Sequence, residues 1–328
     1  MHQPVLPSPI GFLLLPQFTS IALACAIEPL RIANRYVPDK YTWQVLSLDG
    51  SPVPDGNGTL VQADHAYDRT GRLGSLFLLA DIRPERFYSR PLKDWLHRQD
   101  RQGVVLASLD TACFVLARAG LLDGHRATPH WEVIDTFRER FANVAISPTL
   151  FDIGERRLCG AGGSAVLDMM LTAIGLDHGQ AVANRVAEHC LVDRIRAADS
   201  WQRMALPLRS GAHHPTLVRA IRLIEDNPQP APTVSGLSRT LGISERHLLR
   251  LFRDHLGETA HDYLLRVRLE RARALLVQSD LSVTEIAQVV GYGSVAHFSR
   301  AYRRFFGRTP SAGRRKTRPD NLLMDADR

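Results

Sequence analysis

A short helical pattern occurs twice in the last third of this chain. The segments HLLRLFRDHLG (His247–Gly257) and HFSRAYRRFFG (His297–Gly307) share a His, an Arg three positions later, an aromatic residue two positions after that Arg, and a closing Gly. The two copies are offset by 50 residues. A repeated helical pattern predicts two copies of one supersecondary structure.

Each copy follows a second shared pattern, which is typical of two helices joined by a tight turn. The segments LSRTLGIS (residues 237–244) and IAQVVGYGS (residues 286–294) each place a small residue four positions before a Gly, which is Gly242 in the first and Gly291 in the second. A small residue lets two helices approach closely, and Gly adopts the left-handed backbone that a sharp turn needs. The sequence therefore predicts two helix-turn-helix units.

Residues 260–278 contain no Gly or Pro and carry an apolar stripe, so we expect one long helix between the two units. Ser282 and Glu285, which follow, have the spacing of a capping box and predict the start of the next helix. At about 1.5 Å per residue the long helix spans somewhat under 30 Å. Successive major grooves on one face of B-DNA are roughly 34 Å apart. One chain is therefore able to place two helices in neighbouring grooves.

The basic charge is concentrated in the same part of the chain. Residues 211–318 hold 18 Lys and Arg against 9 Asp and Glu, whereas residues 1–210 hold 22 of each kind. A charge excess alone is usually a solvated surface, but one that coincides with a duplicated helix-turn-helix indicates nucleic acid binding.

Residues 215–310 resemble the DNA-binding domain of the AraC/XylS family of transcription regulators. The segment from Ile286 to Pro310 carries the family pattern I-A-x-x-x-G-[FY]-x-S, followed by F-S-R-x-[FY]-[KR]-[KR]-x-x-G-x-[ST]-P. The resemblance implies double-stranded promoter DNA and RNA polymerase as partners. Ala260 departs from the family, which usually has Pro there, and we expect this change to leave the fold intact.

The first turns of each second helix are expected to enter the major groove, where side chains reach base edges. Arg250 and Arg300 occupy the repeated position, and Arg has the best shape for a bidentate contact to guanine. Arg residues one turn later are expected to touch phosphates. The expected base contacts are Ser244, Arg246, Leu249 and Arg250 in the first unit and Ser294, Val295, His297 and Arg300 in the second, with phosphate contacts from Arg253, Arg303 and Arg304.

The first part of the chain alternates between short apolar runs and helical patterns. This alternation predicts an α/β domain with a mostly parallel sheet and helices on both faces, in a flavodoxin-like three-layer arrangement, followed by an all-α domain. Helix is expected again from about residue 163. The expected strands are residues 9–15, 43–48, 75–80 and 103–108, and the expected helices are residues 20–36, 89–100, 111–120 and 131–141.

These patterns divide the chain into a sensing domain at residues 1–205, a linker at 206–214, a DNA-binding domain at 215–312 and a tail at 313–328. No apolar run is long enough to span a membrane, and the N-terminus lacks a basic signal region, so we expect a cytoplasmic protein without membrane contact. The four cysteines are far apart and lack zinc-ligand spacing. We therefore expect reduced thiols, no metal and no cofactor.

The stretch Ala107–Trp131 resembles the nucleophile elbow of class I glutamine-amidotransferase-like domains of the ThiJ/PfpI type. The resemblance places His130 at the family's His and Glu28 at its acidic position, but Asp110 stands where the family has a nucleophilic Cys. Asp cannot reproduce thiolate chemistry, and Cys113 lies about one helical turn beyond the elbow. We therefore expect no enzymatic activity. The alternative is a cysteine-dependent amidase or deglycase fused to a DNA-binding domain, which would need Cys113 to react.

Members of the AraC family with Asp at the elbow and EPLR-x-AN in the first helix resemble activators of arginine, glycine betaine or carnitine catabolism. This resemblance implies a small-molecule effector of the cationic amine or amino-acid class. We also expect a homodimer, because dimerisation would let paired chains span direct or inverted half-sites. A purely architectural DNA-binding protein is disfavoured, because the large first domain would then have no role. The alternative for Glu28 and Asp110 is that their side chains only cap or brace helices. The alternative for His130 and Trp131 is that they belong to a packed loop without a ligand. The expected ligand-binding residues are Glu28, Asp110, Phe114, His130 and Trp131.

Overall fold

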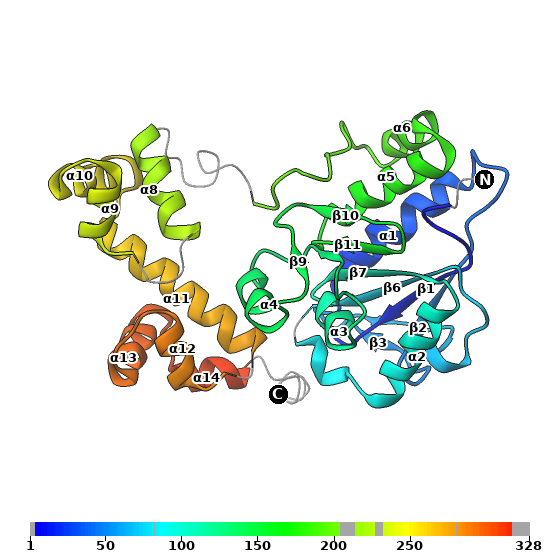
Figure 1. Cartoon of the computed structure of the whole chain (residues 1–328), viewed down its shortest axis with the longest axis horizontal. Helices are drawn as coiled ribbons and strands as arrows, with labels where there is room; N and C mark the ends of the chain where they lie inside the picture. The colour runs from blue at the N-terminus through cyan, green and yellow to red at the C-terminus, as the bar shows by residue number, and fades with distance from the viewer. Residues whose placement is uncertain (1–3, 82, 204–213, 227–231, 280, 317–328) are drawn as a thin grey trace. The chain divides into compact units, whose positions relative to one another are not determined.

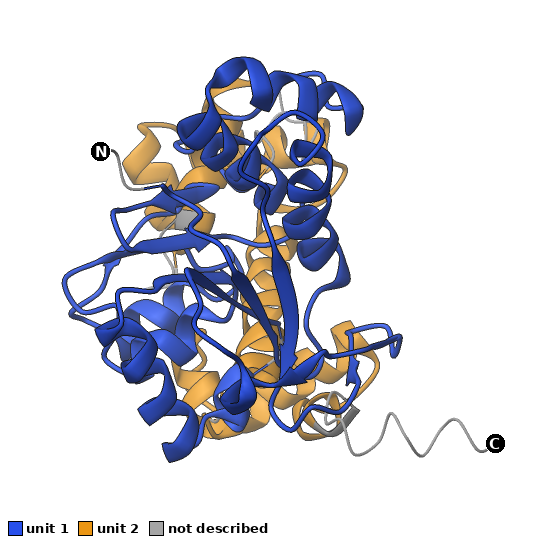
Figure 2. Cartoon of the chain, turned by 90° about the vertical axis from the view of Figure 1, so that its right-hand side faces the viewer, with its two compact units in different colours: residues 1–202 blue, residues 203–328 orange. Residues whose placement is uncertain are grey.

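A computed structural model describes residues 4–81, 83–203, 214–226, 232–279 and 281–316. The chain divides into two compact units, residues 1–202 and residues 203–328, which Figure 2 distinguishes by colour. Almost all of the linker expected at 206–214, and most of the expected tail, lie outside the described residues. Each unit is described by itself.

Unit 1 is built on a seven-stranded sheet with the strand order β10-β11-β7-β6-β1-β2-β5. All neighbouring strands are parallel except β10 and β11. The mostly parallel sheet expected from the sequence is therefore confirmed. The strands are β1 (Ile10–Leu14), β2 (Trp43–Ser47), β5 (His65–Ala66), β6 (Ser75–Ala80), β7 (Val105–Asp110), β10 (Phe151–Ile153) and β11 (Arg157–Gly160).

Helices cover both faces of this sheet (Figure 1). Side chains of β1 alternate between the faces, so that Phe12 and Leu14 lie in one apolar core and Leu13 lies in the other. Burial on both faces explains why the central strands are continuous apolar runs. The first core contains residues of α1 (Ser20–Ala33), α5 (Ala165–His178) and α6 (Gln180–His189), and the second contains residues of α2 (Arg90–Arg101), α3 (Cys113–Arg118) and α4 (Ile134–Arg140).

Short elements complete unit 1. They are the hairpin of β3 (Val53–Pro54) and β4 (Leu60–Val61), the parallel pair β8 (Arg126–Ala127) and β9 (Ala145–Ile146), and the 3₁₀ helices η1 (Tyr67–Arg69) and η2 (Pro84–Phe87).

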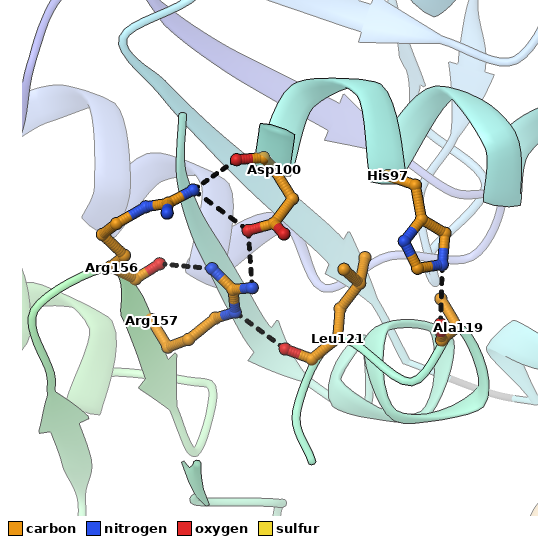
Figure 3. A network of polar contacts seen from close by, with 6 residues as sticks. All are labelled: His97, Asp100, Ala119, Leu121, Arg156 and Arg157. Carbon is orange, nitrogen blue, oxygen red and sulfur yellow. Dashed lines mark hydrogen bonds and ion pairs between the residues drawn. The ribbon is translucent and has the colours of Figure 1, made fainter. Parts of the chain in front are cut away.

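A polar network joins the end of α2 to the start of β11 (Figure 3). The Asp100 carboxylate accepts hydrogen bonds from Nη2 of Arg157 at 2.7 Å and from Nη2 of Arg156 at 3.1 Å. Arg157 is buried, and its Nε donates to the carbonyl of Leu121 at 2.7 Å. Because a buried guanidinium needs an opposite charge and hydrogen-bond acceptors, this network fixes β11 against α2 and the loop after α3.

Unit 2 is helical, as expected. Its described helices are α8 (Pro215–Asp226), α9 (Val234–Leu241), α10 (Glu245–Leu256), α11 (Ala260–Gln278), α12 (Val283–Val289), α13 (Val295–Phe306) and α14 (Pro310–Lys316). The long helix expected at residues 260–278 is confirmed, since α11 has these bounds. Figure 1 shows α11 running from the group of α8, α9 and α10 to the group of α12, α13 and α14.

The two groups have separate apolar cores, and α11 contributes to both. Tyr263 and Leu264, in its first half, pack with α8, α9 and α10, whereas Leu269 and Leu276 pack with α12 and α13. Ala260 is fully buried in the first of these cores, and the neighbouring Thr259 caps α11, so the departure from the family leaves the helix start intact.

Candidate DNA interface and ligand site

The turns of both helix-turn-helix units have the backbone that the sequence predicts. Gly242 ends α9 with φ +68°, and Gly291 follows α12 with φ +83°, both in the left-handed region. The capping box between Ser282 and Glu285 is present, with the Ser282 hydroxyl accepting from the Glu285 amide and the Glu285 carboxylate accepting from the Ser282 amide. These features confirm two tandem units.

The second helix of each helix-turn-helix unit, α10 in the first and α13 in the second, is the recognition helix expected to enter the major groove. Each begins directly after a Ser that the sequence predicts as a DNA contact. The Ser244 hydroxyl accepts from the amide of His247 at 3.2 Å, and the Ser294 hydroxyl accepts from the amide of His297 at 3.5 Å. The two serines therefore cap α10 and α13. An exposed cap at the groove end of a recognition helix is also placed to meet DNA.

The exposed faces of α10 and α13 carry the expected contact residues. On the opposite face, Leu248 and Phe252 of α10 and Phe298 and Tyr302 of α13 are buried, which fixes the rotation of each helix. Half-buried candidates are Leu249 and Val295. The exposed candidates are Ser244, Arg246, Arg250, Arg253, Ser294, His297, Arg300, Arg303 and Arg304.

The candidate ligand site of unit 1 lies at the carboxyl ends of the parallel strands, where such folds bind ligands. Asp110 ends β7 and has φ +62°, a strained value for a residue other than Gly. The sharp elbow expected from the sequence is thus present, with Asp in the nucleophile position. Its Oδ2 accepts a hydrogen bond from the Thr19 hydroxyl, before α1, at 3.1 Å.

Asp110 is only 7% exposed. Burial raises its pKa well above the usual range, repulsion from Asp81 adds to the increase, and the Thr19 hydrogen bond opposes it. The pKa of Asp81 rises from 3.8 to about 6, because of burial and then repulsion from Glu132. The elbow therefore carries two carboxyls with raised pKa values, that of Asp110 well above the usual range and that of Asp81 at about 6.

Gly162, which follows β11, closes one side of the elbow. It has φ +97°, and a Cβ atom added there would lie 2.6 Å from Oδ2 of Asp110. The missing side chain lets the backbone approach the carboxyl closely, so only Gly fits at this position.

Glu28 is not brought to this site. Its carboxylate is 50% exposed and forms an ion pair with Arg31 at 2.6 Å. Thr19 rather than Glu28 reaches Asp110, and nine residues of helix separate the two by about 13 Å along the axis of α1. The expected pairing of Glu28 with Asp110 in one pocket is therefore wrong.

The aromatic candidates differ from one another. Phe114 is 3% exposed, and its ring packs against the rings of Phe137 and Phe141 in the core, so it does not present a face to a ligand. Trp131 is 40% exposed, and its ring centroid lies 5.4 Å from that of His130. Burial lowers the pKa of His130, so this imidazole is neutral at pH 7.

Several residues of the elbow were missed in the sequence, namely Thr19, Asp81, Glu132 and Gly162. Asp81 directly follows the expected strand at 75–80, and the rule that ligands bind at carboxyl ends of strands would have identified it. No sequence pattern distinguishes Glu132, whose effect on Asp81 is electrostatic repulsion.

Cys113 is fully buried, and its thiol donates to the carbonyl of Asp110 at 3.5 Å. Burial raises the pKa of this thiol well above the usual range, which is the opposite of what a thiolate nucleophile requires. Among the described residues, no group of three or more His, Cys, Asp or Glu is arranged to hold a metal ion. Within the same residues, no helix has the length and apolar character needed to cross a membrane.

Comparison with known proteins agrees with this geometry. The chain is 42% identical to the HTH-type transcriptional regulator CdhR of Pseudomonas aeruginosa over 303 residues, which cover 92% of this chain and 90% of the relative. It is 36% identical to the HTH-type transcriptional regulator ArgR of the same species over 312 residues, covering 95% and 94%. Residues 237–316 match the family described as Helix-turn-helix domain.

This chain belongs to the AraC family of transcription regulators. A crystal structure of an AraC family transcriptional regulator from Pseudomonas putida covers 56% of this chain and all of its own, with a TM-score of 0.52 and 26% identity. A ThiJ/PfpI family protein from Pseudomonas syringae shares the fold, with a TM-score of 0.50 and 16% identity over 77% of this chain and 90% of its own. As a member of the family, the chain is a DNA-binding regulator with a ThiJ-like first domain.

Proposed function

We propose that this AraC-family protein is a transcription activator controlled by a small cationic or amine-bearing metabolite, and that the metabolite binds at the elbow around Asp110. The feature that carries the proposal is the buried Asp110 carboxyl, which stands in the place of a nucleophile at the carboxyl edge of the sheet. The resemblance of the EPLRIAN segment to activators of arginine, glycine betaine or carnitine catabolism supports the same ligand class.

The electrostatics of the elbow favour a cation. Asp81 and Glu132 supply negative charge near Asp110, and the neighbouring His130 is neutral at pH 7 because burial lowers its pKa. A cation in a partly dehydrated site gains more from these carboxylates than in water. The exposed Trp131 adds an aromatic face of the kind that binds quaternary ammonium groups.

We further propose that the protein acts as a cytoplasmic homodimer that contacts RNA polymerase, and that unit 1 has no enzymatic activity. The regulator names of the relatives and the buried Cys113 thiol support the last point. The alternative, a cysteine-dependent amidase or deglycase, requires Cys113 to react. Thiol titration of the folded protein and assay of Cys113→Ser distinguish the two, since a fast-reacting thiol and loss of activity would establish the enzyme.

The experiment is calorimetric titration of the full chain with arginine, glycine betaine, carnitine and related amines. We expect one of them to bind, and we expect Asp110→Ala to weaken that binding by tenfold or more. Glu28→Gln is the matched control, because Glu28 lies away from the elbow and should bind like the wild type. Undiminished binding by Asp110→Ala, or no binding by any of the amines, would reject the ligand site.

A further inference from the structure

The last residue of unit 1, Gln202, is hydrogen-bonded to the loop that carries His130 and Trp131. Its Nε2 donates to the carbonyl of Pro129 at 3.0 Å. This carbonyl belongs to the peptide bond that joins Pro129 to His130, so the hydrogen bond fixes the orientation of that peptide. The amide of Val133 in turn donates to the carbonyl of His130 at 2.9 Å and closes the turn that contains Trp131.

A second set of hydrogen bonds joins the same part of the chain to the elbow by another route. Nε2 of Gln202 also donates to the carbonyl of Thr149 at 2.9 Å. The amide of the next residue, Leu150, donates to the carbonyl of Ser200 at 3.0 Å. The carbonyl of Leu150 accepts from the amide of Ala161 at 2.9 Å. Ala161 directly precedes the glycine that closes one side of the elbow.

These contacts attach residues 198–202, here called the exit segment, to the candidate ligand site at two points. None of the five residues of the exit segment is buried, and Trp201 is 74% exposed. Hydrogen bonds rather than apolar burial therefore hold the segment in place. A segment held in this way opens at a low cost in free energy, so it is able to exist in an attached and a released state.

The residue that follows the exit segment is anchored inside unit 2. Arg203 is the first residue of that unit, and its Nη1 donates to Oε2 of Glu225, on α8, at 3.1 Å. Oε1 of Glu225 accepts from the hydroxyl of Tyr263, on α11, at 3.0 Å. The Tyr263 ring packs against the ring of Phe252, on α10, with centroids 5.3 Å apart. Two consecutive residues are thus held, one by the ligand-site loop and the other by the core of a recognition helix.

We propose that the exit segment couples the candidate ligand site to DNA binding, with Gln202 as the positioning residue in unit 1. A cation that contacts the turn around Trp131 binds best when Gln202 holds that turn in place, so the ligand favours the attached state. Attachment orders the residue next to Arg203, which lowers the entropy lost when Arg203 pairs with Glu225. This inference rests on the proposed control by a small cationic metabolite.

The coupling must be reciprocal, because a ligand that changes DNA affinity by some factor has its own affinity changed by DNA by the same factor. DNA bound to α10 orders the core that holds Tyr263 and Glu225, and it therefore favours the attached exit segment. This effect provides a test that does not require the ligand to be known. The amide of Leu150 is the reporter, since its hydrogen exchange is slow only while it donates to the exit segment.

Hydrogen exchange of full-length protein is measured by mass spectrometry on peptides that cover residues 147–152. The protein is compared alone and bound to a DNA duplex that carries a site selected from a random pool by the wild-type protein. In the wild type we expect DNA to slow this exchange about fivefold or more, which is the lower end of usual allosteric coupling.

Two substitutions separate coupling from a local structural role. Gln202→Glu removes the donor and places a carboxylate beside two carbonyl oxygens, so exchange without DNA should be about tenfold faster and DNA should no longer slow it. Arg203→Gln should leave exchange without DNA unchanged, because Arg203 acts in unit 2, but it should also abolish the effect of DNA. The matched controls Gln102→Glu and Arg222→Gln, at exposed positions in unit 1 and unit 2, should behave like the wild type.

An effect of DNA that persists in Gln202→Glu, or that is absent from the wild type, would overturn the inference. Calorimetry with arginine, glycine betaine and carnitine supplies the second measurement. The Kd of an amine that binds should fall about fivefold when the selected duplex is present, and an unchanged Kd would also overturn the inference. If no amine binds, the ligand proposal is rejected, whereas an effect of DNA on residues 147–152 that is lost in Gln202→Glu would still support the coupling.

Discussion

Replacement of Asp81 by Asn is expected to stabilise unit 1 at neutral pH. The pKa of this carboxyl is raised from 3.8 to about 6 in the folded protein, by burial and by repulsion from Glu132. Between these two values the folded state holds a proton that the unfolded chain has lost. The free energy of unfolding therefore falls as the pH rises from about 4 to about 6, and it stays low above that range. An Asn side chain removes this fall.

The magnitude follows from the size of the pKa shift. A shift of roughly two units corresponds to about 3 kcal/mol. Asp81 is only half buried, so solvent screening reduces the expected gain to about 1–2 kcal/mol. A gain of this size raises the Tm of a unit of about 200 residues by roughly 2–8 °C. The Thr111 hydroxyl donates to the backbone carbonyl of Asp81 and not to its side chain, so this hydrogen bond is unaffected by the substitution.

Differential scanning calorimetry of the full chain between pH 4 and pH 7.5 measures this effect. The wild-type transition of unit 1 should lose Tm through the range from pH 4 to pH 6, and the Asp81→Asn transition should lose less. Glu139→Gln is the control, because Glu139 is exposed on α4. Equal pH dependence of the Asp81→Asn variant and the wild type would refute the reasoning that burial keeps a proton on Asp81.

Three further outcomes are expected. Arg300→Ala should lose about 1–3 kcal/mol of binding free energy for a DNA site selected from a random pool by the wild-type protein, and the base preference at one position of that site should be relaxed. Equal losses on random DNA in a gel-shift competition would refute a base contact. Ser282→Ala should destabilise unit 2 by about 0.5–2 kcal/mol through loss of the capping box, and in a double-mutant cycle its effect should not add to that of Glu285→Ala; additive Tm changes would contradict this. Asp100→Asn should destabilise unit 1 by about 3–5 kcal/mol in denaturant unfolding, because the buried Arg157 loses its counter-charge; a change below about 1 kcal/mol would show that the network in Figure 3 contributes little.

Most of the helical architecture could be predicted from the sequence, because local patterns determine it. The bounds of α11 follow from an uninterrupted apolar stripe, and the turns follow from Gly242 and Gly291. The central strands β1, β6 and β7 are apolar runs that burial on both faces requires. The expected helix ends differ from the observed ends by up to three residues. For example, α1 ends at Ala33 and not at residue 36.

The edges of the sheet could not be predicted in the same way. β5, β10 and β11 contain two to four residues each, which is too short for an alternating or apolar pattern to be recognised. β11 also begins with a charged residue, Arg157, which is buried only because Asp100 neutralises it. Long-range pairing of this kind leaves no local signal.

The candidate ligand site could be predicted only in part. The position of Asp110 follows from the elbow resemblance, but the positions of the nearby carboxylates of Asp81 and Glu132 do not. The motif places Glu28 near the elbow, but Glu28 lies in the second half of α1, which carries it away from Asp110 along the helix axis. Asp81 lies nearby because β6 is the neighbour of β7 in the sheet, a fact of topology that one sequence does not reveal.

The shared helix α11 sets the rotation of α13 relative to α10, the two helices expected to contact bases. α10 and α13 each pack in a separate core, but both cores include residues of α11. One residue inserted in the middle of α11 would turn α13 by about 100° relative to α10 and move it only about 1.5 Å along the axis of α11. The helical register of this single segment therefore encodes the spacing and the orientation of the two half-sequences that the protein is able to recognise together.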